Sequence, residues 1–484
     1  MTGLDSTASL WMYAPFAGKP GPFAVSVANA GSFAFSPQGG RLVFSDNTGL
    51  SLVDRWPPNP AALPMTLTAT EFAFLDEARL VVNVADAIEL HDLEAGTREL
   101  LHEIDPADPN PPGEPLYLVR PSPDGRWVAY VEVRNQLHES WLIDLHSMPR
   151  EPARVMTLPA GAVTAWLDWA PDTEHLAISA TDSGGVWLRA YSVATTESTF
   201  EALPISFELE PTASIPTFQW SPTGDALHYY YQYVDLATSE TDWRLYLVDM
   251  TNAAPGPSVL LSDFDERSWA APGYFSPKGD MVAFSADFAG PTFRAAEFVS
   301  HVAHPDTPHR QDAGEFSAVL KQEWSPDNQA LYFTAMLGDD VERLYRSDLT
   351  GSSSLVSSPS ADVRGLYVSP QPGCVAYSQY VPTPAVVVVD ETTQAYYEIG
   401  DPQANNPAWT GNFDSSLARW VSDRNGDVRG LLYVTSEPNL GDGLIWSPVK
   451  SCTPSSPEVV IGSQKGQTIY DVAVSTTPLS GERL

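Results

Sequence analysis

The sequence predicts an all-β fold in which one structural unit is repeated along the chain. Two observations support this prediction: a short hairpin motif that returns at a nearly constant interval, and a composition suited to many strands and turns. The 484 residues include 43 Pro and 32 Gly, which are spread along the chain. Such a distribution is typical of many short strands joined by many turns. With 43% hydrophobic and 11% aromatic residues, the chain can also form a large core.

The repeated motif is a short strand, often ending in an aromatic residue, followed by a Ser-Pro-x-Gly-like turn and a second apolar strand. Clear copies span residues 33–44 and 274–284. Proline presets the first corner of a β-turn, and Asp, Asn or Gly suits the next corners, so the motif predicts a tight hairpin. The turn prolines are Pro37, Pro123, Pro171, Pro222, Pro277, Pro326 and Pro370, at intervals of 86, 48, 51, 55, 49 and 44 residues.

The interval of 86 residues contains a degenerate copy at 72–84, which makes eight copies, and a weaker ninth copy has its two strands at 408–410 and 417–421. Each hairpin is followed by a third strand and a fourth, as at 141–145 and 154–158. Four short strands per repeat of this length is the pattern of a β-propeller blade. We therefore predict a single closed β-propeller over residues 1–484, with eight to ten four-stranded blades. Strands at about 8–30 and 465–477 are expected to pair and close the ring.

Four tryptophans recur at one position of the repeat, namely Trp169, Trp220, Trp324 and Trp409. At a fixed register of a repeated strand, aromatic side chains can pack between neighbouring blades or can form a platform on which a ligand stacks. Their recurrence at one register of the repeat favours packing between blades.

The charge of the chain excludes several classes of partner. There are 26 Lys and Arg against 61 Asp and Glu, which gives a net charge of −35. This balance argues against nucleic acid and against anionic lipid surfaces, and no apolar run reaches the ~20 residues of a membrane span. Acidic stretches at 235–242, 263–266 and 339–342 are expected in loops. They form either a solvated surface or an acidic face that recruits a basic partner.

Two groups of residues are candidate metal ligands. Asp423, Asn425 and Asp427 have the alternate spacing that opens a calcium loop, but Val428 stands where such a loop needs Gly, and a hairpin turn also accounts for these residues. The segment 301–309 holds His301, His304 and His309, whose imidazoles suit transition metals. The prolines between them favour an irregular loop, in which the histidines have no shared role.

The sequence contains no recognised catalytic motif. No G-x-S-x-G nucleophile elbow, Walker A loop or dinucleotide-binding glycine motif occurs in the sequence. Cys374 and Cys452 form either one disulfide or two separate thiols. The first ten residues lack the regions of a signal peptide, which suits a cytoplasmic protein or an exported protein whose signal has been removed.

The Ser-Pro-Asp-Gly hairpin and the following strand, which contains Tyr and ends in Asp, resemble the WD40-like repeats of TolB-type β-propellers. Residues 417–426, followed by 430–434, resemble the hairpin of that family leading into its third strand. The resemblance covers about residues 31–440. It implies a propeller fold and a periplasmic or extracellular location, with which one disulfide is compatible.

These observations lead us to expect a non-catalytic interaction platform without a cofactor. It would bind a protein or peptide partner through one face of the ring. A basic partner would suit the acidic loops. The alternative is a metal-dependent polysaccharide lyase of the oligogalacturonate-lyase type. That propeller enzyme uses a histidine-rich metal site, and here His301, His304 and His309 would be its ligands.

Overall fold

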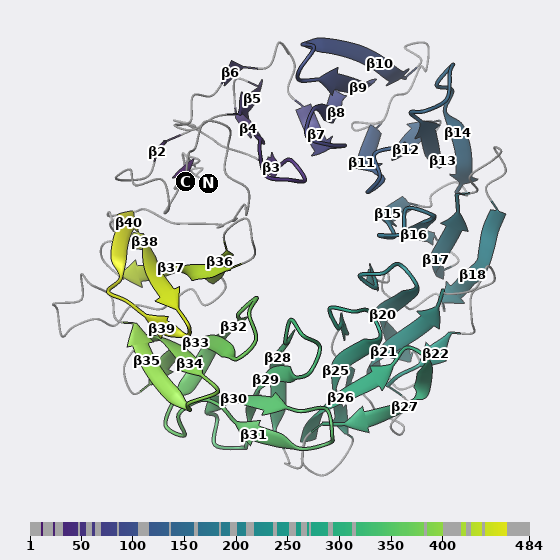
Figure 1. Ribbon diagram of the computed structural model, residues 1–484. Coiled ribbons are helices and arrows are strands. Elements are labelled where there is room, and N and C mark those ends of the chain that lie inside the picture. Colours follow the sequence, from purple (N-terminus) through teal and green to yellow (C-terminus); the bar gives the residue numbers. More distant parts are fainter. Residues whose placement is uncertain are drawn as a thin grey trace, which may run out of the picture.

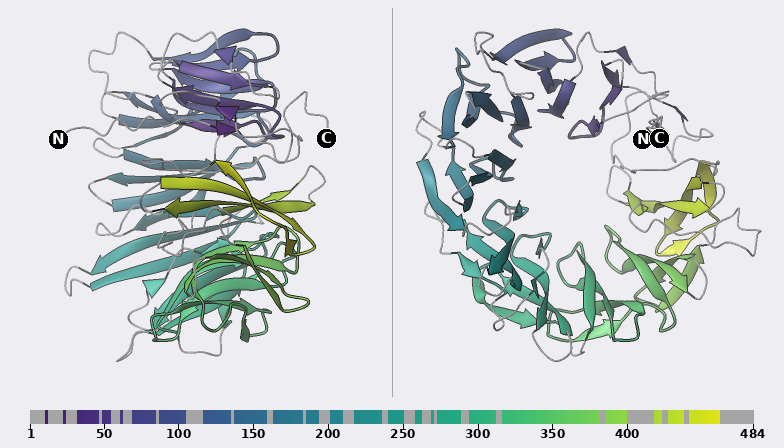
Figure 2. Two further views of the ribbon diagram at one scale, coloured as in Figure 1. Left: turned by 90° about the vertical axis from the view of Figure 1, so that its left-hand side faces the viewer. Right: turned by 180° about the vertical axis from the view of Figure 1, so that it is seen from behind.

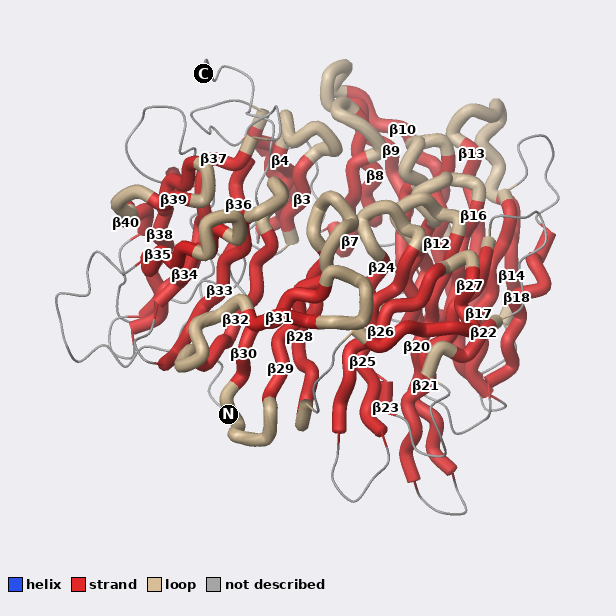
Figure 3. The backbone as a smooth tube through the Cα atoms, turned by 60° about the horizontal axis from the view of Figure 1, so that its bottom comes forward, coloured by secondary structure: helices blue, strands red, loops and turns tan. Residues whose placement is uncertain are grey.

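The computed structural model is all-β, and Figure 3 shows strands and loops without a helix among the residues that it describes. It follows that no helix long and apolar enough to cross a membrane occurs in those residues. The described residues are 11–12, 23–24 and 32–461, apart from 47–48, 55–60, 63–68, 85–86, 105–115, 135–136, 159–162, 183–184, 194–200, 210–216, 236–239, 251–257, 263–268, 271–272, 289–293, 312–315, 382–384, 400–417, 423–426 and 438–440.

Consecutive strands form antiparallel sheets that succeed one another around a central axis (Figures 1 and 2). In Figure 1 the first strand of each sheet lies nearest the axis and the last strand lies on the periphery. We call each group of consecutive strands that begins at the axis a repeat unit. The described strands form nine such units. The coarse prediction of an all-β fold with repeated four-stranded sheets is therefore confirmed.

The first four units are regular four-stranded sheets. Unit 1 contains β3 (Phe33–Phe35), β4 (Leu42–Asp46), β5 (Gly49–Val53) and β6 (Ala61–Ala62). Unit 2 contains β7 (Ala69–Phe74), β8 (Arg79–Val84), β9 (Ala87–Asp92) and β10 (Thr97–Glu103). Unit 3 contains β11 (Leu116–Pro121), β12 (Trp127–Arg134), β13 (Leu137–Asp144) and β14 (Ala153–Thr157). Unit 4 contains β15 (Val163–Trp169), β16 (His175–Asp182), β17 (Gly185–Ser192) and β18 (Glu201–Leu209).

The remaining units follow the same order with local additions. Unit 5 contains β19 (Thr217–Trp220), β20 (Ala226–Asp235), β21 (Glu240–Asp249) and β22 (Val259–Leu260). Unit 6 contains β23 (Trp269–Ala270), β24 (Tyr274–Phe275), β25 (Met281–Phe288), β26 (Arg294–His301) and β27 (His304–Arg310). Unit 7 contains β28 (Ala318–Trp324), β29 (Leu331–Met336), β30 (Glu342–Ser347) and β31 (Ser353–Leu355). Unit 8 contains β32 (Asp362–Val368), β33 (Cys374–Val381), β34 (Ala385–Asp390) and β35 (Ala395–Ile399). Unit 9 contains β36 (Ala418–Ser422), β37 (Val428–Glu437), β38 (Gly441–Lys450), β39 (Thr453–Pro454) and β40 (Glu458–Ile461).

Two parts of the chain differ from this regular pattern. β23 pairs in parallel with β21 and antiparallel with β25, so units 5 and 6 share one nine-stranded sheet. Near the N-terminus, β1 (Trp11–Met12) pairs with β2 (Phe23–Ala24). The predicted closing strand at 465–477 and most of residues 8–30 lie outside the described residues.

The predicted ninth copy is shifted along the chain. We expected residues 417–421 to form the second strand of its hairpin, but β36 is the first strand of unit 9 and pairs with β37. The weak motif at 408–410, including Trp409, lies outside the described residues. The misplacement arose because the β36–β37 turn has no proline to mark it, whereas the copies used to set the repeat do.

The serine of the turn motif explains why these hairpins form. In unit 5, the hydroxyl of Ser221 accepts a hydrogen bond from the Ala226 amide at 3.0 Å and donates one to the Asp225 carboxylate at 2.9 Å. Equivalent serines in units 3, 6 and 7 make the same two kinds of contact. Gly224 has a φ of +81°, and a Cβ there would lie 2.8 Å from Asp172 in the neighbouring turn. The motif thus both closes the hairpin and lets adjacent turns pack closely.

The hydrophobic core lies between neighbouring sheets. Between units 4 and 5, small side chains of one sheet face large aromatic side chains of the next, as where Ala177 and Ala190 share a cluster with Tyr229 and Tyr231. The Tyr229 ring stacks on Tyr246 with centroids 4.9 Å apart. This alternation of small and large residues fills the space between two twisted sheets.

A hydrogen bond close to the axis joins many neighbouring units. Four tryptophan indoles donate Nε1–H to a carbonyl on the first strand of the preceding unit: Trp169 to Arg120 at 3.0 Å, Trp220 to Asp168 at 3.4 Å, Trp324 to Tyr274 at 2.9 Å and Trp420 to Tyr367 at 3.0 Å. Three of these are the predicted packing tryptophans, and the fourth is Trp420. The side chains of Trp169, Trp220 and Trp324 are buried, which supports packing between units.

At two junctions without an indole hydrogen bond, a glutamate makes a different contact: its carboxylate accepts a backbone amide of the following unit. Glu71 of unit 2 accepts the Val119 amide of unit 3 at 2.9 Å, and Glu323 of unit 7 accepts the Val368 amide of unit 8 at 3.0 Å. Two different side chains therefore satisfy polar backbone groups at the same kind of junction.

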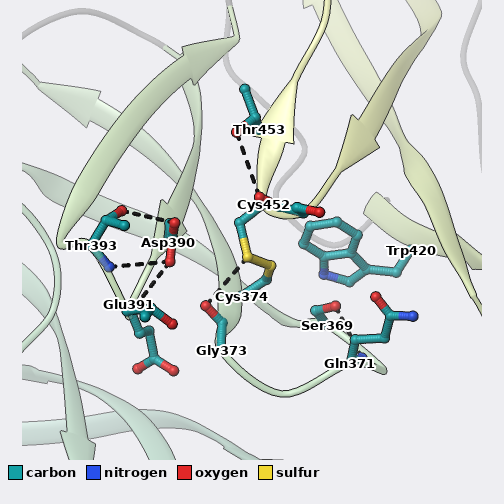
Figure 4. Close-up of a disulfide and its surroundings, with 12 residues drawn as sticks. Ser369, Gln371, Gly373, Cys374, Asp390, Glu391, Thr393, Trp420, Cys452 and Thr453 are labelled. Carbon is teal, nitrogen blue, oxygen red and sulfur yellow. Dashed lines mark hydrogen bonds between the residues drawn. A yellow bond between two sulfur atoms is a disulfide. The ribbon is translucent and has the colours of Figure 1, made fainter.

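A disulfide between Cys374 and Cys452 links units 8 and 9 (Figure 4). Cys374 begins β33, and Cys452 lies in the turn between β38 and β39. Their Cα atoms are 5.5 Å apart, and the Cys452 sulfur lies 3.4 Å from the Gly373 carbonyl oxygen. Of the two alternatives that the sequence left open, the structure has the bridge.

Candidate functional site

The innermost strands expose more apolar surface than packing requires. Eleven large hydrophobic side chains are exposed among the described residues, and four of them lie on these strands. They are Val163, Trp166, Tyr274 and Leu320, which are 44%, 49%, 46% and 51% exposed. They are distributed over β15, β24 and β28, and exposed aromatic side chains are enriched at protein interfaces. We call the exposed and half-buried side chains of the innermost strands the axial surface.

A row of polar side chains crosses the axial surface next to the turns. In five units it is formed by the residue that precedes the last position of the innermost strand, and in unit 9 by the residue that precedes Trp420. The row contains Arg120, Asp168, Gln219, Tyr274, Glu323 and Arg419. The backbone carbonyls of Arg120, Asp168 and Tyr274 accept the indole hydrogen bonds, so these positions are fixed by the junctions between units. The scaffold therefore holds a set of charged and aromatic groups at one height around the axis.

A β-bulge recurs in the innermost strands of five units. The pairing register shifts in β7, β11, β15, β28 and β32, and each shift lies in the half of the strand farther from the turn. In β28 and β32 the extra residues are Leu320 and Arg364, and both are exposed. A bulge leaves a residue unpaired and turns its side chain away from the regular alternation. The bulges thus add side chains to the axial surface.

The charge of the innermost strands differs from that of the whole chain. The described residues of these strands include four bases, Arg120, Lys321, Arg364 and Arg419, and four acids, Glu71, Asp168, Glu323 and Asp362. The whole chain has 61 acidic residues against 26 basic ones. The axial surface is therefore balanced in charge inside a strongly acidic molecule.

In units 2 to 4, one arginine lies between two carboxylates. The Arg120 guanidinium is 3.6 Å from Glu71, and its charge also acts on Asp168. Burial raises the pKa of the Asp168 carboxyl, while Arg120 and the Trp169 amide oppose this rise. The carboxylates hold Arg120 in place, so it can present its remaining N–H donors to a ligand.

In units 7 and 8, carboxylates are paired with more exposed cations. Lys321 Nζ is 3.9 Å from the buried Glu342, and the Arg364 guanidinium donates to Asp362 at 2.6 Å. Lys321 also donates to the Arg364 carbonyl, which ties β28 to β32. Burial lowers the pKa of the Lys321 ammonium, and the nearby charge of Arg364 acts in the same direction.

Glu323 is the most strongly perturbed carboxyl of the axial surface. Burial raises its pKa to about 7, although the Val368 amide and the charge of Arg419 favour its ionised form. At neutral pH this side chain is therefore divided between its two protonation states. Carboxyl groups with strongly perturbed pKa values are common at functional sites.

The structure does not gather the three candidate histidines into a metal site. The expected loop is a strand pair: His301 ends β26, and His304 and His309 lie on β27. His301 faces His304 across the pair, whereas His309 faces Val299. Five residues along a strand span about 16 Å, so His304 and His309 are too far apart to share one ion. Among the described residues, no group of three or more His, Cys, Asp or Glu could hold a metal.

The candidate calcium residues can be placed only in part. Asp423 and Asn425 lie outside the described residues. Asp427 precedes β37, is exposed, and lies 3.8 Å from the Arg429 guanidinium. The only described member of this set therefore has a cation beside it, and that contact suits the hairpin interpretation.

The acidic stretches are only partly in loops. Asp235 ends β20, and Glu240 begins β21, so these residues belong to a long hairpin. In the stretch 339–342, Asp339 pairs with Arg343 at 2.6 Å, and Glu342 is buried on β30. Residues 263–266 lie outside the described part of the chain. The expectation of freely solvated loops was wrong for Glu342, because strand pairing places it against Lys321.

Sequence reasoning missed the axial surface. The tryptophans at the end of the innermost strands were recognised, but the neighbouring polar row was not. The sequence did contain a signal for this row. In several copies of the repeat, the residue before the tryptophan is charged or polar, as in Asp168, Gln219 and Glu323. Alternation along a strand places that residue on the opposite side from the packed tryptophan.

Comparisons with known proteins find similar structures but no sequence family. No family model matches, and no curated protein matches. The β-propeller domain of the trilobed protease from Pyrococcus furiosus is 13% identical, with a TM-score of 0.31 and coverage of 78% of this chain and 98% of that one. A putative TolB from Agrobacterium tumefaciens is 18% identical, with a TM-score of 0.27 and coverage of 51% and 83%. Oligogalacturonate lyase in complex with manganese is 14% identical, with a TM-score of 0.36 and coverage of 79% and 98%.

The chain also spans 46% of the tricorn protease that it matches. These similar structures are β-propeller proteins with different functions, and at these identities and TM-scores they do not choose among functions. An assignment must come from the site itself.

Proposed function

We propose that this protein is a non-catalytic platform that binds a protein or peptide partner at the axial surface. The observation that carries the proposal is that exposed apolar side chains, Trp166 and Tyr274 among them, lie on the same innermost strands as the charged row. Trp, Tyr and Arg contribute most to binding at protein interfaces. A rigid ring of sheets holds these groups in place, which lowers the entropy lost on binding.

The acidic remainder of the surface has a separate role in this proposal. A net charge of −35 attracts basic partners over long distances and increases their rate of association. The contacts of the axial surface would then determine affinity. Salt should therefore slow association more than it speeds dissociation.

The location that agrees best with the proposal is periplasmic or extracellular. The Cys374–Cys452 disulfide supports this part, because such bonds persist in oxidising compartments. Trapping free thiols in cells of the source organism and locating the protein by fractionation would test it. Alkylation of both cysteines together with recovery in the cytosol would contradict it.

The binding proposal can be tested with a matched pair of tyrosines. Tyr274 on the innermost strand β24 is 46% exposed, and Tyr396 on the outermost strand β35 is 44% exposed. Partners are captured from extracts of the source organism at low and high salt, and their affinities for the variants are measured. We expect Tyr274→Ala to weaken binding by about tenfold or more, whereas Tyr396→Ala leaves it unchanged. Equal effects of the two substitutions would contradict docking at the axial surface.

The polysaccharide lyase alternative is tested in the same preparations. Elemental analysis should find no stoichiometric transition metal that is lost when His301, His304 and His309 are all replaced by Ala. Turnover of an acidic polysaccharide by the pure protein, together with such a metal, would replace the platform proposal.

A further inference from the structure

The cations of units 7 and 8 are more exposed than their carboxylate partners. The Arg364 side chain is 52% exposed and that of Asp362 is 12% exposed, while the values for Lys321 and Glu342 are 41% and 5%. An ion pair seen from its positive end presents a cationic surface, even though its net charge is zero. These pairs therefore leave N–H donors of Lys321 and Arg364 accessible to a ligand.

A third cation, Arg419, lies on the neighbouring innermost strand, β36. Arg419 on β36 is exposed, and its charge acts on Glu323, the carboxyl with the raised pKa. β28 contacts β32, and β32 contacts β36, so the three cations stand on adjacent innermost strands. Gly365 on the middle strand is required by close packing, since a Cβ there would collide with the side chains of Tyr367 and Ser378.

An exposed apolar residue completes this region. Leu320 is the bulged residue of β28 and directly precedes Lys321. Its exposure of 51% places an aliphatic group beside the cations. A ligand that matches both features carries a carboxylate next to an apolar side chain.

We infer that Lys321, Arg364 and Arg419 form a subsite for one acidic side chain of the bound peptide segment, with an apolar neighbour of that side chain on Leu320. The inference rests on the proposed function and names the chemistry of its site. The net charge of −35 repels polyanions over long distances, which favours a single carboxylate over an acidic polysaccharide. Exposed apolar side chains on β15 and β24 extend the surface beyond the cations, so the carboxylate belongs to an internal residue of an extended segment.

The test uses random 12-residue segments displayed inside a carrier protein, so that neither end is free. Segments selected on the wild-type protein are synthesised with blocked ends and with either Glu or Gln at the acidic position. We expect the Glu form to bind about tenfold more tightly, as for the loss of one charge-assisted hydrogen bond. In Arg364→Gln this difference should vanish, and in Arg419→Gln it should shrink.

Arg154→Gln is the matched control. Arg154 is 54% exposed above a buried partner, Glu139, but it lies on the outermost strand β14. It should keep the full preference for Glu. Thermal unfolding of each variant shows whether it folds. Arg364→Gln removes the ion-pair partner of Asp362, and if that variant does not fold, Arg419→Gln provides the second test.

The outcomes separate the two proposals. Selected segments without an acidic residue, or a preference for Glu that persists in Arg364→Gln, would overturn the subsite while leaving the platform intact. Binding only by peptides with a free C-terminal carboxylate would overturn the assignment to a side chain. Failure of every segment to bind would contradict the proposed function itself.

Discussion

The junction between units 4 and 5 and the junction between units 8 and 9 share one contact and differ in the others. Each has an indole hydrogen bond, from Trp220 in one and Trp420 in the other. Units 4 and 5 are otherwise joined by stacked aromatic rings around Tyr229, which face small alanines. Units 8 and 9 are joined by a cluster in which Tyr367 and Tyr433 lie among aliphatic side chains, and in addition by the Cys374–Cys452 disulfide.

The difference shows that each junction is stabilised by its own pair of neighbouring sheets. In a repeated fold, a unit contacts mainly the units on either side, so the stability of each junction is set locally. A junction with less aromatic packing can be reinforced by a covalent link without any change in its neighbours. The relative contributions of these contacts can be measured by removing them one at a time.

The largest loss is expected from Tyr229→Ala in the aromatic junction. The Tyr229 side chain is buried, stacks on Tyr246, and bonds to the Ser258 hydroxyl at 2.7 Å. Replacing a buried aromatic residue with Ala leaves a cavity and should cost about 3–5 kcal/mol. Urea unfolding followed by tryptophan fluorescence measures this change. Tyr396→Ala, on an exposed site, is the control, and a similar loss in that variant would refute the comparison.

Removal of the disulfide should have the next largest effect. The bridge closes a loop with a sequence separation of 78 residues, and its loss should destabilise the protein by about 2–4 kcal/mol. Unfolding of Cys452→Ala with and without a reductant provides the measurement. The reductant should lower the stability of the wild type to that of the variant and leave the variant unchanged. A wild type indifferent to reductant would mean that packing alone holds this junction.

The Glu323 contact between units 7 and 8 should make the free energy of unfolding depend on pH. Its folded pKa of about 7 lies above the ordinary value near 4.3, so folding favours the protonated form. The folded state then binds the extra proton between these two pH values, and this contribution to stability is lost as the pH rises through about 7. Glu323→Gln keeps an acceptor for the Val368 amide and should be more stable than the wild type at pH 8, by about 2 kcal/mol. Parallel stability curves for the two proteins from pH 5 to pH 8 would contradict this effect.

The smallest effect is expected from the contact that the two junctions share. Trp220→Phe and Trp420→Phe remove the indole donor while keeping an aromatic ring. Each should cost about 1 kcal/mol, the usual value of a buried hydrogen bond. Denaturant midpoints of the two variants should shift by similar amounts, and a large difference between them would show that the shared contact is not equivalent.

The repeated sheets could be predicted from the sequence because the turn motif determines where each hairpin begins. Proline and serine act locally in the turn, so their spacing reports the repeat without knowledge of the fold. Where the turn proline is absent, as after β36, the same reasoning misplaced the strand by one position in the unit. The packing role of Trp169, Trp220 and Trp324 could be predicted as well, because it follows from their register.

The axial surface could not be assembled in the same way, because it depends on side chains from units far apart in the sequence. Lys321, Arg364 and Arg419 are 43 and 55 residues apart along the chain and become neighbours only when the sheets are arranged around the axis. Bulges add to the difficulty, since an extra residue in a strand reverses the expected alternation for Leu320. The pairing of Glu342 with Lys321 could not be predicted either, because the two residues lie on the first and third strands of unit 7, which are not hydrogen-bonded to each other.

The short strand β23 has a consequence for how the molecule opens. Its backbone bonds join β21 to β25, so the ladder continues from β19 to β27 without the break that separates other neighbouring units. Units 5 and 6 should therefore exchange their amide hydrogens as one cooperative block. When neighbouring sheets separate, units 5 and 6 should therefore move as one body. Side chains provide most of the links at the other junctions, although a backbone bridge between Ala295 and Phe316 also joins unit 6 to unit 7.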